Sequence, residues 1–323
     1  MRAATRATYG RPDVIDVRDV DRPTLTADGV LVRVRASSVN PVDWHELTGA
    51  PYIVRLACGV RRPRKELFGT DFAGTVEAVG ENVTHFQRGD EVFGVRDGAF
   101  AEYVLVPEDR PVVTKPDNVT FEEAAAVGVA ALTALQGLRD KGALQPGQKV
   151  LINGASGGVG TFAVQIAKAL GAEVDGVCST RNVELGTSLG ADHVIDYTQE
   201  DFARRDRRYD LLLDVAGNRA WPEYKRVLAP QGTLVMVGGP KTNRWIGALG
   251  DRLKVKLMAS RDTRNVATFL AKPNKEDLAT LADLMNAEKV TSAIDRRYEL
   301  SEIGDAFRYL GERHARAKVV ITV

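Results

Sequence analysis

The chain has 323 residues, of which 44% are hydrophobic and 27% are charged, and its formal net charge is +1. This length favours two domains, and the near-neutral charge provides no field that would draw the chain to nucleic acid or to an anionic membrane. Cys58 and Cys178 are too few and too far apart to indicate a disulfide framework. With no secretory signal and no apolar run of membrane-spanning length, we expect a cytoplasmic protein with neither nucleic-acid nor membrane partners.

The first 110 residues are expected to form short strands separated by turns. Residues 30–35 alternate apolar and charged side chains, which is the pattern of a half-buried strand, and residues 74–79 and 91–94 look similar. Glycines recur throughout residues 69–98. This spacing is typical of a compact antiparallel β unit with tight turns.

Beyond Pro116 the pattern changes to alternating helices and strands. Helices are predicted at 121–137, 157–170, 183–189 and 221–228, and strands at 149–153, 173–178, 193–195, 209–215 and 233–237. Such repeated alternation indicates a parallel sheet that helices cover on both faces.

The C-terminal part is expected to return to the first domain. The predicted elements there are a helix at 275–287, an extended stretch near 295–300, a helix near 303–310 and an apolar strand at 317–323. We therefore expect a nucleotide-binding domain, residues 123–262, inserted between two parts of a β-rich catalytic domain, residues 1–122 and 263–323. The polar stretch 251–264 has no assigned role.

A glycine cluster is the strongest local motif, and it joins a predicted strand to a predicted helix. It reads Asn153-Gly-Ala-Ser-Gly-Gly-Val-Gly160. Glycines in this setting allow a tight turn, the close approach of a phosphate and close packing of helix on strand. The start of the helix offers free N–H groups and partial positive charge to a diphosphate. The motif predicts a dinucleotide site, and the alternative is a glycine-rich turn without a ligand.

The end of the next strand favours NADPH over NADH. Enzymes that use NAD usually place a carboxylate there to bond the ribose hydroxyls, whereas this strand ends in Ser179, Thr180 and Arg181. Hydroxyls and a guanidinium suit a 2′-phosphate. We place Asp175 within the strand, from where it would point away from the ribose. The alternative for Arg181 is a solvated loop charge.

With these motifs the chain resembles the zinc-free medium-chain dehydrogenases/reductases of the quinone oxidoreductase group, which includes ζ-crystallin and the alkenal/enone reductases. The resemblance covers essentially the whole chain. It implies an α/β protein with a doubly wound Rossmann domain, a GroES-like β-rich domain and a cofactor in the cleft between them. The matching stretches are 36–43, 68–74, 98–103, 130–135, 153–160, 189–197 and 317–321.

The resemblance also implies the residues that bind the cofactor. Asn40 and Thr133 are expected at the nicotinamide, residues 156–159 at the diphosphate, and Tyr197 near the adenosine phosphate. Glycines at strand ends are expected to face the cofactor. The full expected set is Asn40, Thr133, Gly154, Ser156, Gly157, Gly158, Val159, Gly160, Ser179, Thr180, Arg181, Tyr197, Gly217, Gly238, Gly239 and Lys318.

No zinc site is expected. Zinc enzymes of this superfamily use a cysteine and a histidine where this chain has Asn40 and Thr70-Asp71, and amides and hydroxyls are poor zinc ligands. The four-cysteine structural lobe of those enzymes has no counterpart in a chain with two cysteines. The histidines are scattered without metal-ligand spacing, at His45, His85, His193 and His314.

Without a metal to activate a ketone or alcohol, the expected substrate is a quinone or an α,β-unsaturated carbonyl, whose conjugation spreads the charge that hydride brings. Asn40 and Tyr52 are the candidate catalytic residues, with Tyr52 as a proton donor and water as an equal alternative. Asn40 could instead be a turn residue before Pro41, and Tyr52 a packing residue. The basic segment 52–67 is either a solvated loop or a lid for an anionic substrate.

Two other functions stay open. One is a metal-independent alcohol or ketone dehydrogenase, and the other is a non-catalytic NADPH-binding protein. The family resemblance further implies a homodimer, paired through an edge strand near 233–237 or through the segment after it.

Overall fold

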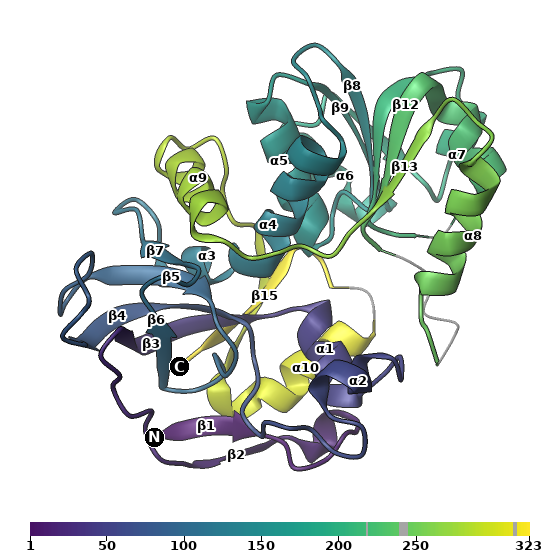
Figure 1. The fold of residues 1–323 in the computed structure, drawn as a ribbon. Helices are drawn as coiled ribbons and strands as arrows, with labels where there is room; N and C mark the ends of the chain where they lie inside the picture. Colours follow the sequence, from purple (N-terminus) through teal and green to yellow (C-terminus); the bar gives the residue numbers. More distant parts are fainter. Residues whose placement is uncertain (218, 239–244, 313–314) are drawn as a thin grey trace. The chain divides into compact units, whose positions relative to one another are not determined.

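The computed structural model describes residues 1–217, 219–238, 245–312 and 315–323. The chain divides into two compact units. A β-rich unit contains residues 1–132 and 272–323, and an α/β unit contains residues 133–271 (Figure 1).

A seven-stranded sheet with the order β14-β15-β3-β4-β5-β7, in which β6 also pairs with β3, forms the centre of the β-rich unit. The last strand, β15, pairs antiparallel with β3, which confirms that the C-terminus returns to the N-terminal unit. A separate pair, β1 and β2, is antiparallel. The strands are β1 (Arg2–Thr5), β2 (Asp16–Asp19), β3 (Gly29–Val39), β4 (Asp71–Val79), β5 (Glu91–Val95), β6 (Tyr103–Pro107), β7 (Val112–Thr114), β14 (Ile294–Glu299) and β15 (Lys318–Thr322).

Helix α10 covers part of this unit with an apolar stripe. Its Ile303, Ala306 and Phe307 recur at helical spacing and are buried. The ring of Phe307 lies 5.8 Å from that of Phe100, which in turn lies 5.2 Å from that of Phe68. The helices of the unit are η1 (Pro12–Val14), α1 (Pro41–Thr48), α2 (Val54–Cys58), α3 (Phe121–Ala125), α9 (Lys275–Asn286), η5 (Leu300–Glu302) and α10 (Ile303–Gly311).

The α/β unit contains a parallel sheet with the order β10-β9-β8-β11-β12-β13. Counted from β8, this is the order 3-2-1-4-5-6 of a doubly wound Rossmann sheet, and helices cover both faces as predicted (Figure 1). Its strands are β8 (Lys149–Asn153), β9 (Glu173–Cys178), β10 (His193–Asp196), β11 (Tyr209–Asp214), β12 (Leu228–Met236) and β13 (Asn265–Thr268). Its helices are η2 (Gly137–Lys141), α5 (Gly158–Ala169), η3 (Thr180–Asn182), α6 (Val183–Ser188), η4 (Phe202–Arg204), α7 (Trp221–Val227) and α8 (Leu249–Ala259), after α4 (Gly128–Gln136) leads in from the β-rich unit.

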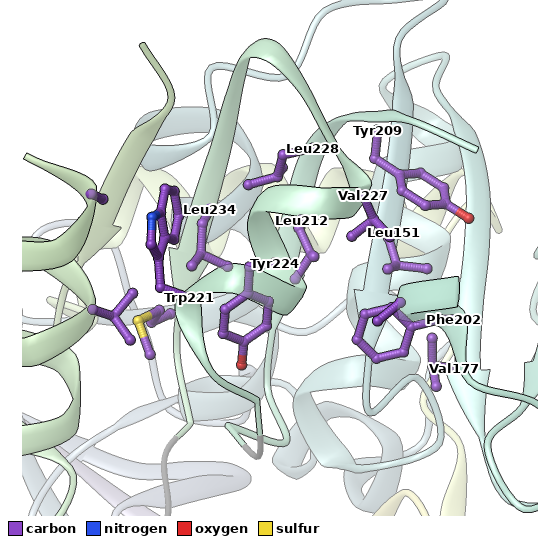
Figure 2. Packing of buried hydrophobic residues seen from close by; sticks show 14 of the residues in the cluster. Leu151, Val177, Phe202, Tyr209, Leu212, Trp221, Tyr224, Val227, Leu228 and Leu234 are labelled. Carbon is purple, nitrogen blue, oxygen red and sulfur yellow. The ribbon is translucent and has the colours of Figure 1, made fainter. Parts of the chain in front are cut away.

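One apolar cluster of the α/β unit lies between α7 and the sheet. Leu212 and Leu234 from two neighbouring strands pack with Trp221 and Tyr224 of α7 (Figure 2). Phe202 extends the cluster beside Val177. These side chains are apolar at strand and helix periods, so local pattern and burial agree.

The predicted single helix at 121–137 is wrong, because the structure breaks it into α3 and α4. Thr120 caps α3 by accepting the N–H of Glu123 at 3.2 Å. At the start of α4, the N–H of Val129 donates to Asp71 at 2.9 Å. A Cβ at Gly128 would lie 2.1 Å from the same carboxylate. The interruption therefore leaves the N–H of Val129 able to donate to the buried Asp71, whereas in a continuous helix this N–H would bond to a carbonyl of the preceding turn.

The two compact units divide the chain differently from the expected domains. Residues 123–132 belong to the β-rich unit rather than to the nucleotide domain, because α3 packs on β3 and β4. Residues 263–271 belong to the α/β unit, because β13 extends the parallel sheet beside β12. Because β12 pairs with β11 on one side and with β13 on the other, residues 233–237 do not form an edge strand. The homodimer stays a prediction from the resemblance.

We predict that Phe307→Ala lowers the free energy of unfolding by about 3–5 kcal/mol, since it removes a fully buried aromatic ring. Urea unfolding followed by circular dichroism measures the change. Leu270→Ala is the control, because Leu270 is 86% exposed and its loss should cost about 0.5 kcal/mol or less. Equal effects of the two substitutions would contradict the assigned core.

Candidate functional site

The turn between β8 and α5 has the geometry of a phosphate-binding loop. Gly154 has φ +96°, in the left-handed region that glycine tolerates. Its N–H and that of Ala155 both donate to the carbonyl of Val177, at 3.1 and 2.9 Å, which fixes the turn to β9. Gly157 precedes α5 and has no side chain to cap it, and backbone N–H groups at such a helix start are of the kind that bind anions.

Two glycines of this turn serve different purposes. A Cβ at Gly160 would lie 2.1 Å from the carbonyl oxygen of Gly154, so the close packing of α5 on the turn requires glycine there. Among the described residues, a Cβ at Gly157 would meet only that same oxygen, at 3.6 Å, which is ordinary contact. The described residues therefore leave room for a side chain at 157. In strand–turn–helix units that bind dinucleotides, a middle glycine of this kind is the one that lets a phosphate approach the backbone.

Asn182 links the turn to the end of β9. Its amide nitrogen donates to Ser156 Oγ at 3.0 Å and to Ser179 Oγ at 3.2 Å, so two predicted cofactor residues are brought together. Asn182 is buried, and its Oδ1 has no hydrogen-bond partner among the described residues. No sequence signal pointed to this residue, because its partners lie on two separate segments.

At the ends of β9 and β10, Thr180 and Tyr197 lie on neighbouring segments. Thr180 donates its hydroxyl to Asp196 at 2.6 Å, which lowers the pKa of that carboxyl. The N–H of Tyr197 donates to the carbonyl of Cys178 at 3.0 Å, and the Tyr197 side chain is 58% exposed. Arg181 is exposed as well. The hydroxyl of Thr180 thus contributes to the loop structure, while Tyr197 and Arg181 are presented outward.

Asp175 lies inside β9, as predicted. It is fully buried, accepts a hydrogen bond from the Tyr209 hydroxyl at 2.6 Å, and lies 3.3 Å from Nε of Arg207. Both contacts are made by Oδ2, and because the whole carboxylate is buried it is not presented to a ribose at the strand tip.

Asp214, which the sequence analysis did not single out, organises the carboxyl ends of β8 and β11. It accepts hydrogen bonds from the Asn153 amide at 2.8 Å, the N–H of Gly217 at 3.0 Å and the Tyr224 hydroxyl at 2.5 Å. Burial raises the pKa of this carboxyl, and the hydrogen bonds oppose the shift. The predicted cofactor residue Gly217 is therefore held at a strand end beside the glycine turn.

The end of β12 is held by α8. A Cβ at Gly238 would lie 1.8 Å from the carbonyl oxygen of Val215, so glycine is required there by the chain itself. Arg252 of α8 donates to the carbonyls of Val237 and Gly238, which gives the unassigned stretch 251–264 a structural role. Gly239 lies outside the described residues.

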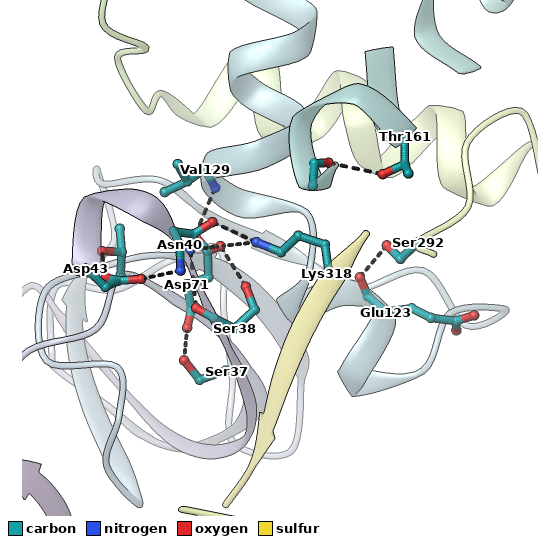
Figure 3. A network of polar contacts seen from close by, with 12 residues as sticks. Ser37, Ser38, Asn40, Asp43, Asp71, Glu123, Val129, Thr161, Ser292 and Lys318 are labelled. Carbon is teal, nitrogen blue, oxygen red and sulfur yellow. Dashed lines mark hydrogen bonds and ion pairs between the residues drawn. The ribbon is translucent and has the colours of Figure 1, made fainter. Parts of the chain in front are cut away.

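In the β-rich unit, Asn40 is the centre of a buried polar cluster (Figure 3). Its amide nitrogen donates to Asp71 Oδ2 at 2.8 Å and to the carbonyl of Ser38 at 3.2 Å, and its Oδ1 accepts from Lys318 Nζ at 2.7 Å. The Asn40 amide is therefore committed to the protein. Lys318 is 2% exposed and lies 3.6 Å from Asp71, so its ammonium serves this cluster.

Asp43 holds the start of α1, a helix that the sequence analysis did not predict. One carboxylate oxygen accepts the N–H of Asn40 at 2.8 Å, and the other accepts the hydroxyl of Thr70 at 2.6 Å. Asp43 is fully buried, and desolvation raises its pKa to about 7. The run Asn-Pro-x-Asp is a helix-start pattern that could have revealed this residue from the sequence.

The two remaining candidates, Thr133 and Tyr52, lie on helix α4 and in the turn before α2. Thr133 is 9% exposed on α4. Tyr52 precedes α2 and is partly exposed, with the guanidinium of Arg55 4.8 Å from its ring centroid. Within the basic segment 52–67, Lys65 pairs with Asp97 at 2.6 Å and both side chains are exposed.

Over the described residues no group of three or more His, Cys, Asp and Glu side chains is arranged to hold a metal ion. His314 lies outside the residues described. No helix in the described part of the chain has both the length and the apolar character to cross a membrane.

Comparison with known proteins identifies the family. Residues 26–117 match the model of the alcohol dehydrogenase GroES-like domain, and residues 189–321 match that of the zinc-binding dehydrogenases. A quinone oxidoreductase of Pseudomonas aeruginosa is 33% identical over 98% of this chain and 97% of its own length. An NADPH-dependent alkenal/one oxidoreductase of Arabidopsis thaliana is 30% identical over 99% of this chain and 79% of its own length.

Among solved structures, the quinone oxidoreductase of Coxiella burnetii superposes with a TM-score of 0.87 at 30% identity, covering 100% of this chain and 99% of that one. The GroES-like and Rossmann-type architecture predicted from the sequence is thereby confirmed. The chain belongs to the quinone oxidoreductase group of the medium-chain dehydrogenase/reductase superfamily, and it is an oxidoreductase.

Proposed function

We propose that this protein is an NADPH-dependent, zinc-independent cytoplasmic reductase that transfers hydride to a quinone or to an α,β-unsaturated carbonyl. The observation that carries the cofactor choice is the end of β9. Ser179 and the exposed Arg181 follow the strand there, while Asp175 is buried within it on Tyr209 and Arg207. A guanidinium favours a 2′-phosphate, and a carboxylate at the strand tip would repel it.

The residues of the α/β unit fit a dinucleotide. The turn at 154–160 and the uncapped start of α5 would hold the diphosphate, with the space above Gly157 left open for it. Ser179 and Arg181 would hold the 2′-phosphate, and the exposed Tyr197 ring would lie near the adenosine. Thr133 is proposed at the nicotinamide. When bound, the cofactor supplies the hydride.

The polar cluster of the β-rich unit supports zinc independence. The ammonium of Lys318 lies 2.7 Å from Asn40 Oδ1 and 3.6 Å from Asp71 Oδ2. It supplies the positive charge that this buried carboxylate needs, and it would repel a divalent cation placed among the same groups. Thr70 adds a hydroxyl, which is a poor zinc ligand.

Two of the predicted roles change in the light of these contacts. Both amide hydrogens of Asn40 are committed to Asp71 and Ser38, so we propose that Asn40 shapes the nicotinamide end rather than bonding the substrate. Lys318 is proposed as the residue that positions Asn40. Tyr52, which is partly exposed, keeps its proposed place near the acceptor.

We predict that Gly157→Ala weakens NADPH binding at least tenfold while the free energy of unfolding changes by about 0.5 kcal/mol or less. The added methyl group meets nothing closer than 3.6 Å in the described part of the chain but would occupy the space proposed for a phosphate. Calorimetry with NADPH and urea unfolding measure the two effects. Gly160→Ala is the contrast, since its methyl group would lie 2.1 Å from a backbone oxygen and should destabilise the protein itself. If the Gly157→Ala variant bound NADPH as tightly as the wild type, the assignment of a phosphate to this turn would be wrong.

We predict that NADPH binds more tightly than NADH, and that Arg181→Ala weakens NADPH binding about 10- to 100-fold with little effect on NADH. A charge-assisted hydrogen bond to phosphate is worth about 1.5–3 kcal/mol, which corresponds to this range. Arg204→Ala is the matched control, because its side chain is 82% exposed in the same unit. Equal affinities for the two dinucleotides would overturn the NADPH assignment.

A substrate panel tests the reaction. With NADPH, we expect oxidation of the cofactor by 2-alkenals, vinyl ketones or quinones, unchanged after treatment with a zinc chelator. Alcohols offered with NADP⁺ should react at least 100 times more slowly. Alcohol oxidation abolished by the chelator would contradict zinc independence. NADPH binding without turnover of any acceptor would favour a non-catalytic role.

A further inference from the structure

The buried cluster around Asn40 reaches the surface at one side chain. Asn40, Asp43, Asp71 and Lys318 are each at most 2% exposed. Thr70 donates to Asp43 and is itself partly exposed. Among the described residues of this network, Thr70 is the one whose side chain is not fully buried. Any proton that enters or leaves the cluster along these hydrogen bonds therefore passes through Thr70.

The cluster contains more acid than base. Asp43 and Asp71 are both buried, but Lys318 supplies a single positive charge and lies close to Asp71. Burying an ionised carboxyl without a cation is costly, so the carboxyl without a partner takes up a proton. That carboxyl is Asp43, whose pKa desolvation raises to about 7, with Asp71 and Glu46 adding to the shift.

Other charges on the neighbouring elements are engaged elsewhere. Arg55 of α2 lies over the rings of Tyr9 and Tyr52, and Arg308 of α10 pairs with Asp13 and Asp305. On α1 itself, Glu46 pairs with Arg6 at 3.4 Å. The charged groups that act on the pKa of Asp43 are therefore Asp71, Glu46 and, from β15, Lys318.

The hydrogen bonds of Asp43 determine where its proton lies. Oδ2 accepts the N–H of Asn40, so the proton belongs on Oδ1, which faces Thr70 Oγ1 at 2.6 Å. A threonine hydroxyl carries one hydrogen. When Asp43 is ionised, that hydrogen is directed inward to the carboxylate. When Asp43 is protonated, the acid donates to Thr70 Oγ1, and the threonine hydrogen is free to point outward.

We propose that Thr70 is the proton donor to the reduced acceptor and that Asp43 is the acid that resupplies Thr70. The proposal rests on the proposed function, with the reduced nicotinamide as hydride source. Hydride forms a C–H bond at the β-carbon, and the π electrons move to the carbonyl oxygen to give an enolate. The enolate takes the hydrogen of Thr70 as Thr70 takes the proton of Asp43. Water reprotonates Asp43 through Thr70 after the product leaves, so one solvent proton is consumed per hydride.

The test compares Thr70→Val, which removes the hydroxyl, with Thr70→Ser, which keeps it. Positioned general acids contribute about 10²–10⁴-fold, so we expect kcat with a vinyl ketone to fall about 100-fold or more in the valine variant. The serine variant should stay within a few-fold of the wild type. Calorimetry should give the same Kd for NADPH in all three proteins. A valine variant with wild-type kcat would overturn the relay.

Isotope effects separate a proton donor from a residue that only maintains the site. In Thr70→Val, proton transfer becomes limiting, so the effect of deuterium at C4 of NADPH on kcat should shrink while the effect of D₂O should grow. A merely structural role would leave the D₂O effect unchanged. The wild-type rate should also fall as the pH rises above about 7, because Asp43 must be protonated. Asp43→Asn should remove this fall.

A readout independent of turnover is the pH dependence of stability. The pKa of Asp43 is raised in the folded protein from its usual 3.8 to about 7, so the folded state binds the proton more tightly. This contribution to stability is full below pH 3.8 and is lost as the pH rises to 7. Asp43→Asn should flatten that slope in urea unfolding, and an unchanged slope would overturn the assignment of the proton to Asp43. Failure of the wild type to oxidise NADPH with any acceptor would overturn the proposed function and the relay with it. Normal turnover in Thr70→Val would overturn the relay alone.

Discussion

The hydrogen bonds of buried Asp71 tie together four segments that are far apart in the sequence. Its carboxylate accepts from Ser38 and Asn40 at the end of β3, and from the N–H of Val129 at the start of α4. Lys318 of β15 lies beside it and donates to Asn40, 278 positions away. A buried carboxylate without these partners would cost several kcal/mol. The unit can therefore bury Asp71 only when β3, β4, β15 and α4 are all in place.

The two units present polar groups by different means. In the α/β unit the donors are those of the backbone, which the glycines at 154 and 157 leave accessible at the start of α5. In the cluster around Asn40 of the β-rich unit the polar groups are side chains, which are hydrogen-bonded to one another and to the backbone. Backbone donors suit an anion that is bound but not changed, whereas hydrogen-bonded side chains can pass a proton. This division agrees with a cofactor held by one unit and acid–base chemistry located in the other.

Membership of the quinone oxidoreductase group is compatible with many acceptors, because the superfamily scaffold hosts several chemistries. What is particular to this chain is its balance of buried charge. One ammonium among two buried carboxyls makes an acid that titrates near neutral pH beside a partly exposed hydroxyl. A second buried cation would have kept both carboxyls ionised, and the cluster would then have no proton to supply.

Local pattern determined most of the fold before any contact was known. The strands at 149–153 and 173–178, the helix after the glycine turn and the apolar C-terminal strand all follow from side-chain period, and period depends only on neighbours in sequence. Glycine positions indicated the proposed phosphate turn for the same reason. The location of Asp175 inside β9 also follows from counting along the strand.

Tertiary structure decided what those residues do. The break between α3 and α4 and the parallel strand β13 depend on partners in distant segments, so their local patterns were uninformative. Lys318 was predicted at the cofactor but serves Asn40, and Thr70 was considered only as a missing zinc ligand. The sequence alone determined which chemical groups are available and on which elements they lie. Only the folded chain decided which of them are buried together, because pKa and hydrogen bonding depend on neighbours in space.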